Sequence, residues 1–371
     1  MANTETRVSP GLWALAWRRL RADRAAMLAM VVLLIYLITL VLSFTGVVAG
    51  DWADEVAVNY APPSFVGAQA TTGMPAAGGN VKADMPPPEN PLDPLKDILR
   101  ELRGTSSSSQ AAAVNDYGIK DPLEKEMTEI RAELAKSGVA AVGERKQTLV
   151  FGADKWGHDI IKKTIKGAET SIIVGLVAAF LATLLGTIFG AVSGYYGKWV
   201  DDVFNWFYSI FTSVPYLLLI LAVAAVLQQK GVMTIVLILG LTGWTGTYRL
   251  IRAEYLKHKT REYVLAADAI GASNARRIFS HIFPNVSHVA LVQVSILVVG
   301  FIKSEVILSF LGFGVPVGVV SWGSMLNEAQ NELILGKWWQ LTAATVAMAV
   351  LVTAFSLFTD ALRDALDPKL K

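Results

Sequence analysis

The sequence predicts an all-α membrane protein with six transmembrane helices. Of its 371 residues, 53% are hydrophobic and only 17% are charged, and the mean hydropathy is +0.45. Such a composition is unusual for a soluble domain and typical of a chain that crosses the bilayer several times. A hydrocarbon core of about 30 Å requires roughly 20 apolar residues in a helix. Six stretches are long enough: 26–48, 171–194, 204–227, 232–251, 286–311 and 339–362.

Basic residues flank these stretches unevenly. Residues 1–25 contain five Arg against two acids, the 249–285 segment is rich in Lys and Arg, and the C-terminal tail contains one Arg and two Lys. With six spans these three regions face one side, which the positive-inside rule makes the cytoplasm. We therefore expect both termini in the cytoplasm. The first apolar stretch is too long for a cleaved signal peptide, so we expect it to remain as a span.

The segment between the first two spans, 49–169, then lies outside the cell membrane. Its Pro-, Gly- and Ala-rich part, 61–94, is typical of irregular linkers. One helix is predicted near 122–137, because Asp121 is a plausible N-cap before a stripe of four apolar residues: Leu123, Met127, Ile130 and Leu134. Two interpretations are open: an insertion that packs on the outer face, or a docking surface for an extracytoplasmic partner.

Several kinds of chemistry are not indicated. The chain has no Cys, so no disulfide or thiolate site is possible. It has no Gly-x4-Gly-Lys-Ser/Thr motif, so we expect no ATP hydrolysis by this chain and no cofactor bound to it. Its four His lack metal-ligand spacing, and no nucleophile elbow is present. We expect no catalytic residue, no metal site and no nucleic-acid partner.

The segment 252–285 between the fourth and fifth spans has an organised pattern. Residues 263–269 are free of helix breakers, Gly271 interrupts the pattern among small residues, and 274–283 can form a second helical run that Pro284 ends. A helix, a small-residue turn and a second helix between two spans would act as a stiff lever. A push on this lever should move both spans.

This segment resembles the cytoplasmic "EAA" loop of permease subunits of ABC importers of type I. That motif is Glu-Ala-Ala, three residues, Gly, nine residues and Ile-x-Leu-Pro. The chain has Leu265-Ala266-Ala267, then Gly271, then His281-Ile282-Phe283-Pro284. Both Ala, the Gly and the Pro match at the right spacing, whereas the Glu is replaced by Leu265. Because that Glu is thought to help anchor the loop on the ATPase, Asp268 or Glu262 is expected to take over its polar contact.

Further motifs resemble the C subunits of dipeptide and oligopeptide importers. They are Gly-Ala-Asp-Lys-Trp-Gly-His-Asp at 152–159, Gly-Ala-Glu-Thr-Ser at 167–171, Gly-Tyr-Tyr-Gly at 194–197 and Leu-Ser-Phe-Leu-Gly at 308–312. The resemblance covers 11–60 loosely and 150–368 well. It implies a cytoplasmic N-terminus and first transmembrane helix in 1–60, an extracytoplasmic insertion in 61–149, and a permease core in 150–371 with five transmembrane helices and a coupling loop at 252–285.

The resemblance also implies a function and partners. The chain would be the non-catalytic subunit that forms half of the path for di- and oligopeptides in a bacterial inner membrane. A second homologous permease subunit, an extracytoplasmic substrate-binding protein and two ATPase subunits that hold ATP and Mg would complete the importer. The expected ATPase-coupling residues are Glu262, Ala266, Ala267, Asp268, Gly271, Ala272, Ser273, Arg276 and Pro284. Nickel chelates, glutathione, haem or antimicrobial peptides as cargo remain the alternative.

Two residues inside the spans are candidates for the translocation path. Glu305 lies in the fifth span, where a charge usually faces a cavity or a partner, and it either lines the path or is hydrogen-bonded within the bundle. Pro215 should kink the third span, which exposes backbone carbonyls, although packing explains it equally well. A secondary transporter is a rival class, but it would need ionisable residues near the span centres. A membrane-anchored sensor would need an autonomous outer core.

Overall fold

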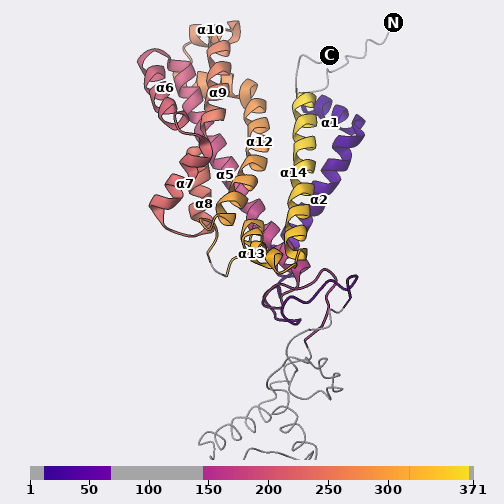
Figure 1. Ribbon diagram of the computed structural model, residues 1–371. Coiled ribbons are helices and arrows are strands. Elements are labelled where there is room, and N and C mark those ends of the chain that lie inside the picture. The colour runs from indigo at the N-terminus through magenta and orange to yellow at the C-terminus, as the bar shows by residue number, and fades with distance from the viewer. Residues whose placement is uncertain (1–11, 68–144, 317, 367–371) are drawn as a thin grey trace, which may run out of the picture. The chain divides into compact units, whose positions relative to one another are not determined.

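The computed structural model describes residues 12–67, 145–316 and 318–366. The chain divides into two compact units, one comprising 1–68 and 146–371 and the other 69–145. Every described helix belongs to the first unit. The helix expected near 122–137 and the interior of the expected insertion lie outside the described residues. The described residues contain helices and isolated β-bridges but no strand (Figure 1).

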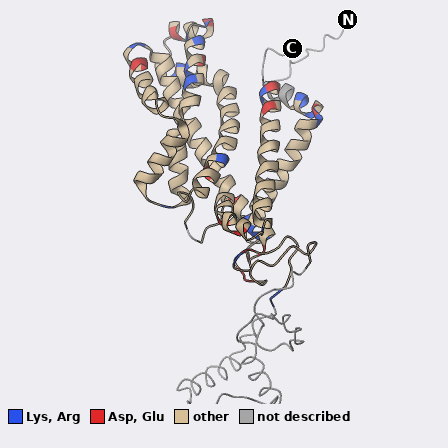
Figure 2. Cartoon of the chain, viewed as in Figure 1, with Lys and Arg blue, Asp and Glu red and all other residues tan. Residues whose placement is uncertain are grey.

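Five helical segments are long and apolar enough to cross a bilayer. They are Arg24–Phe44 (α2), Ile160–Tyr196 (α5), Val232–Lys259, Asn274–Phe310 and Trp339–Ala365. The third consists of α8, Val232–Thr242, and α9, Thr245–Lys259. The fourth contains α11, Asn274–Arg276, a π-helix η1, Arg277–Ile282, and α12, Phe283–Phe310. The last belongs to α14, Trp339–Leu366. Most charged residues of these helices lie toward the helix ends, as expected in a bilayer (Figure 2).

The stretch expected as a third span, 204–227, is not one straight helix. It is divided between α6, Lys198–Thr212, and α7, Tyr216–Leu227, whose axes differ by 84°. Pro215 has no N–H to donate and disfavours a helical conformation at Val214, so the helix ends before it and restarts after it. Within the described residues there are therefore five candidate spans, or six if this bent pair counts as one.

Helix α5 packs against α9, α8 and α12 and is the central element of the bundle. Three of its glycines, spaced four residues apart, face α9: Gly186, Gly190 and Gly194. A Cβ on Gly190 would lie 2.8 Å from the carbonyl oxygen of Tyr248. The missing side chains let the two backbones approach closely, as in small-xxx-small packing between membrane helices.

Helix α6 is attached to the same helix pair through aromatic and ionic contacts. Phe207 stacks on Trp244, with ring centroids 5.4 Å apart. Arg252 of α9 donates from Nε and Nη2 to the two carboxylate oxygens of Asp201, each at 2.6 Å. Ser193 of α5 also donates to Asp201. A bidentate pair of this kind fixes orientation as well as distance, so α5, α6 and α9 are joined at this level of the bundle.

Two helices were not expected from the sequence. Helix α1, Leu12–Ala22, precedes the first span, and α13, Trp322–Ile334, lies between the fifth and sixth. Ser321 caps α13 in a reciprocal capping box with Ser324. Helix α10, Glu262–Ala269, and helix α13 lie at opposite ends of the bundle, which we term the α10 end and the α13 end (Figure 1). Helix α1 and the last turns of α14 lie at the α10 end.

Candidate coupling surface and translocation path

Helix α10 is attached to the bundle by one narrow face. Val264 and Ala267 are 3% and 4% exposed. Val264 packs in a cluster with Tyr255 of α9 and with Ile278 and Ile282 of η1. The Tyr255 hydroxyl donates to the Ile278 carbonyl at 3.2 Å. This small core connects α10 to the span before it and to the span after it, so α10 cannot shift without disturbing both.

The turn after α10 explains the glycine at position 271. The amide of Ala272 donates to the Ala267 carbonyl at 3.0 Å, and the amide of Gly271 donates to the Asp268 carbonyl at 2.9 Å. These two bonds form a Schellman motif, in which the residue after the C-cap adopts a left-handed conformation. Gly271 has φ of +81°, which favours glycine, and a Cβ placed there would meet nothing within 4 Å. Gly271 therefore stops the helix and lies on an open surface.

The outward face of α10 and its cap carries large apolar side chains. Leu265 is 56% exposed and Ile270 is 84% exposed, and Glu262 and Ala266 are exposed beside them. Leu265 occupies the position of the motif glutamate. An apolar side chain held on an exposed helix at the tip of a polar loop can contribute to a contact by burial, whereas a glutamate would contribute through hydrogen bonds.

The other expected coupling residues divide into two groups. Asp268 forms an ion pair with Arg277, so it supports the loop itself. Ser273 caps α11 by accepting a hydrogen bond from the Arg276 amide at 3.3 Å. Arg276 and Pro284 are exposed, and Ala272 is 9% exposed. The structure thus brings all nine residues into one helix–turn–helix segment, in which Glu262, Ala266, Gly271 and Arg276 lie open to solvent.

A π-helix, η1, lies at the base of this segment and was not expected from the sequence. Each π-type bond spans five residues, so one extra residue is accommodated per turn, and such bulges are frequent at functional sites. Pro284 follows η1 in the first turn of α12, where its missing N–H is tolerated. The π-helix therefore lies where the loop that carries α10 joins α12.

Glu305, a candidate for the path, is fully buried. Its carboxylate accepts hydrogen bonds from Ser171 at 2.6 Å and from Ser309 at 2.7 Å. The Ser171 hydroxyl accepts in turn from the Trp322 amide at 3.2 Å. This network ties α5, α12 and α13 together, which favours the interpretation that Glu305 is hydrogen-bonded within the bundle. Pro215, the other candidate, is exposed at the break between α6 and α7.

A buried charge cluster at the α13 end was missed in the sequence. Lys163 of α5 donates to Asp154 and to Glu328 of α13, each at 2.6 Å, and to Gln340 of α14 at 3.3 Å. Burial disfavours the ionised form of Asp154, but Lys163 and the His158 amide more than offset this, so its pKa is held below the ordinary value. The contact between Lys163 and Gln340 joins residues 177 positions apart in the chain, and no local pattern reveals such a contact.

Glu332 of α13 lies beside this cluster without a hydrogen-bond partner. It is 1% exposed, and neither carboxylate oxygen makes a hydrogen bond among the described residues. Burial raises the pKa of its carboxyl to about 7; Lys163 and the nearby backbone amide of Lys155 oppose the shift, and the Asp154 and Glu328 carboxylates add to it. The group therefore takes up and releases protons near neutral pH.

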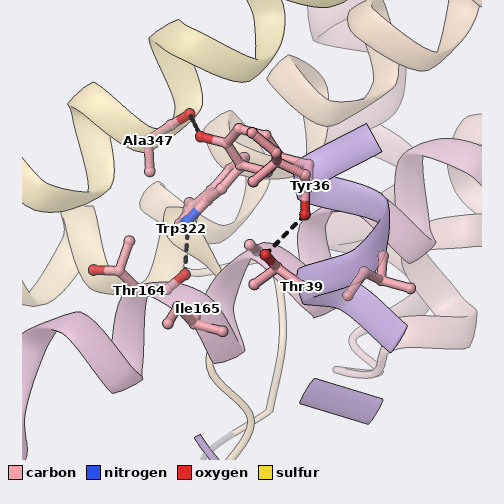
Figure 3. Close-up of a pocket in the computed structure, with 9 residues that line it drawn as sticks. Tyr36, Thr39, Thr164, Ile165, Trp322 and Ala347 are labelled. Atoms are coloured by element: carbon pink, nitrogen blue, oxygen red, sulfur yellow. Dashed lines mark hydrogen bonds between the residues drawn. The ribbon is translucent and has the colours of Figure 1, made fainter. Parts of the chain in front are cut away.

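A cavity of about 320 Å³ lies between α2, α5, α13 and α14 (Figure 3). Its polar groups are engaged with the wall: the Tyr36 hydroxyl donates to the Ala347 carbonyl at 2.8 Å, and the Trp322 indole donates to the Thr164 carbonyl at 3.1 Å. The remaining lining is mainly apolar. The cavity therefore lacks free polar groups to hold a polar cargo. Among the described residues, no group of three His, Cys, Asp or Glu could hold a metal ion.

Comparison with known proteins gives two family matches. Residues 182–371 match the binding-protein-dependent transport system inner membrane component. Residues 11–63 match the N-terminal TM domain of oligopeptide transport permease C. The second match covers α1, α2 and the loop that follows.

Curated relatives agree with these matches. The chain is 37% identical to the dipeptide transport system permease protein DppC of Bacillus subtilis over 60% of this chain and 69% of the relative. It is 38% identical to the oligopeptide transport system permease protein OppC of the same organism over 60% of this chain and 72% of the relative. The OppC protein of Haemophilus influenzae is 34% identical over 59% of this chain and 70% of the relative.

The fold is that of a type I importer permease domain, as the motifs of the coupling loop implied. The helical bundle, its five or six spans and the two matches agree with one another. The chain is a bacterial multi-pass membrane protein, and it belongs to the family of inner membrane components of binding-protein-dependent transport systems.

Proposed function

We propose that this chain is the non-catalytic permease subunit that forms half of an import path for di- and oligopeptides. The three relatives named above are permease proteins of dipeptide or oligopeptide transport systems. These relatives do not favour the alternative cargoes: nickel chelates, glutathione, haem or antimicrobial peptides. A second homologous permease subunit would complete the path, two ATPase subunits would bind ATP and Mg, and an extracytoplasmic binding protein would deliver the peptide.

The outward face of α10 supports the coupling role most directly. Leu265 and Ile270 present apolar surface to the outside of the bundle, while Val264, on the opposite face, is locked to α9 and η1. A partner that grips the outer face therefore moves two spans through one packed core. This chain contributes a conformational step and no covalent one. In this proposal the α10 end faces the cytoplasm, consistent with the basic residues of the 249–285 segment.

Two glycines at opposite ends of the bundle provide a matched test of coupling. Gly336 follows α13 in the same Schellman geometry as Gly271 after α10. The amide of Gly336 donates a hydrogen bond to the Leu333 carbonyl, and the amide of Lys337 donates to the Glu332 carbonyl. Its φ is +74°, against +81° for Gly271, and neither position has an atom within 4 Å of a new Cβ. A tryptophan thus causes similar backbone strain at both sites, but only the one at Gly271 would obstruct a partner at α10.

We expect Gly271→Trp to abolish ATPase association and uptake while the chain still inserts and folds. Gly336→Trp should keep ATPase association. The measurements are copurification of the ATPase subunits and uptake of a radiolabelled tripeptide into cells. Normal uptake by Gly271→Trp, or equal loss of ATPase subunits in both variants, would contradict the assignment.

The cargo is tested separately. Cells dependent on this importer should take up the labelled tripeptide, and unlabelled di- and tripeptides should compete. A nickel chelate, glutathione or haem in equal excess should not compete. Competition by one of these compounds without competition by peptides would overturn the peptide assignment but not the coupling role.

A further inference from the structure

Helix α1 carries a row of arginines at the start of the first span. Arg18, Arg21 and Arg24 are exposed and follow one another at intervals of three residues. On a helix this spacing places Arg18 and Arg21 on one face, and Arg24 opens α2 just beyond the break at Asp23. The Arg21 guanidinium lies over the ring of Trp17, 4.8 Å from its centroid, and Trp17 is 45% exposed. Trp and Arg side by side are typical of a helix at a membrane surface.

The length of α2 places this row at the level of lipid head groups. Its 21 residues extend about 32 Å, which matches a hydrocarbon core of about 30 Å. Its first residue, Arg24, must then lie at the edge of that core. Helix α1 cannot enter the core, because its arginines would lose their hydration there.

Contacts within the bundle hold α1 in this position. Leu20 is 5% exposed and packs in a cluster with Ala26 of α2 and Ala365 of α14. The Arg19 guanidinium donates to the Ala365 carbonyl at 3.5 Å. Helix α1 is therefore folded against the ends of α2 and α14, and its position at the bilayer boundary is fixed.

The local charge is positive. Among the described residues, this end of α1, α2 and α14 holds five Arg and three Asp: Arg18, Arg19, Arg21, Arg24, Arg363, Asp23, Asp360 and Asp364. Asp23 is engaged with the backbone, since it accepts from the amides of Ala25 at 2.8 Å and Ala26 at 3.2 Å. Figure 2 shows the basic residues on α1 at this end of the helices.

We propose that Arg18, Arg21 and Arg24, with Trp17, form a binding surface for the head groups of anionic phospholipids. A guanidinium can donate two hydrogen bonds to a phosphodiester, and an additional negative charge on the lipid strengthens the attraction. Each basic residue close to an anionic surface raises binding about fivefold. The surface would anchor the first span against α14 at a fixed depth, whatever cargo the transporter carries.

The test uses the full-length chain in nanodiscs of phosphatidylcholine and phosphatidylglycerol in equal amounts. After the chain is released from the nanodiscs, native mass spectrometry counts the lipids of each kind that stay bound to it. We expect the natural chain to retain phosphatidylglycerol preferentially, and Arg18→Gln, Arg21→Gln and Arg24→Gln together to lower that retention at least tenfold. The same three positions changed to Lys should keep most of the preference, because the charge remains.

A matched control removes three exposed positive charges elsewhere at the α10 end, with Arg249→Gln, Lys257→Gln and Arg261→Gln. This control should keep the preference. Equal loss in the control would show a general charge effect and overturn the site. Three other results would also overturn the site. They are equal retention of both lipids by the natural chain, an unchanged lipid preference in the Gln variant, and equal loss of that preference in the Gln and Lys variants. A copurifying protein that shields α1 from lipid would overturn it as well.

Discussion

Leu265 occupies the position of the motif glutamate, so the proposed contact with an ATPase subunit would rest on apolar burial instead of a hydrogen bond. Burying a leucine side chain contributes about 1.5–3 kcal/mol. We expect Leu265→Ser to weaken ATPase association about tenfold to a hundredfold, measured as binding of the purified ATPase subunits to the chain in nanodiscs. Leu335→Ser is the matched control, since Leu335 is 58% exposed at the α13 end and Leu265 is 56% exposed. Equal affinities for the two variants would contradict the contact.

Glu332 makes the stability of the α13 end dependent on pH. Its pKa is about 7 in the folded chain and its ordinary value is 4.5. Below pH 4.5 both states hold the proton, so the carboxyl costs nothing. Between pH 4.5 and 7 the unfolded chain releases the proton first, so stability falls with rising pH by up to about 3 kcal/mol and then stays level above pH 7.

Glu332→Gln removes this dependence because the amide does not ionise. The apparent Tm of the variant should therefore exceed that of the natural chain at pH 8, and the difference should shrink toward pH 5. Scanning fluorimetry of both proteins across this range measures it. A difference that grows toward low pH would show that Glu332 is stabilised in its charged form, contrary to its burial without a hydrogen-bond partner.

Among the elements, the pairing of α5 with α9 depends on the absence of side chains. Gly190→Ala places a Cβ 2.8 Å from the Tyr248 carbonyl, so we expect a loss of about 1–3 kcal/mol in stability. Gly300→Ala, in the interior of α12, meets nothing within 4 Å and should be neutral or stabilising by up to about 1 kcal/mol. Opposite shifts in apparent Tm are expected, and a shift of the same sign and size in both variants would count against close backbone packing.

The elements also show what a sequence can reveal. The length of the apolar stretches located most of the spans, and Gly271, which interrupts the helical pattern, marked the end of α10. Both features could be predicted because each depends only on neighbouring residues in the sequence. The bend at Pro215 was expected as a kink, but its 84° angle depends on packing around α6 and α7. Helix α13 was missed because it is short and only partly apolar, and its Ser321–Ser324 capping box was not recognised. The π-helix η1 has no local sequence signature.

The candidate site was predicted in part for the same reason. The nine residues expected to couple to an ATPase lie within 23 consecutive positions, from Glu262 to Pro284, so a motif could locate them together. Their division into exposed and internally bonded residues was not predictable, because the Asp268–Arg277 ion pair and the packing of Val264 depend on the folded turn. Likewise, the contact of Lys163 with Glu328 joins residues 165 positions apart.

At the scale of the whole molecule, the two ends of the bundle would bind different partners in the proposed function. The α10 end presents an apolar helix that is packed onto two spans, and the α13 end presents a buried charge cluster that ties α5, α13 and α14 together. The long helices α5 and α12 extend between the two ends and, in the proposed function, would transmit motion from one end to the other. A soluble ATPase would therefore act on α10, and an extracytoplasmic binding protein would act at the other end.

Site-specific cross-linking can show which end of the bundle contacts the ATPase, because the natural chain contains no Cys. Ile270 and Ile334 are each 84% exposed, Ile270 at the α10 end and Ile334 at the α13 end. In membranes that contain the complete transporter, Ile270→Cys should cross-link to an ATPase subunit through a short thiol-to-amine reagent, and Ile334→Cys should not. Cross-linking of the ATPase to Ile334→Cys but not to Ile270→Cys would contradict the account.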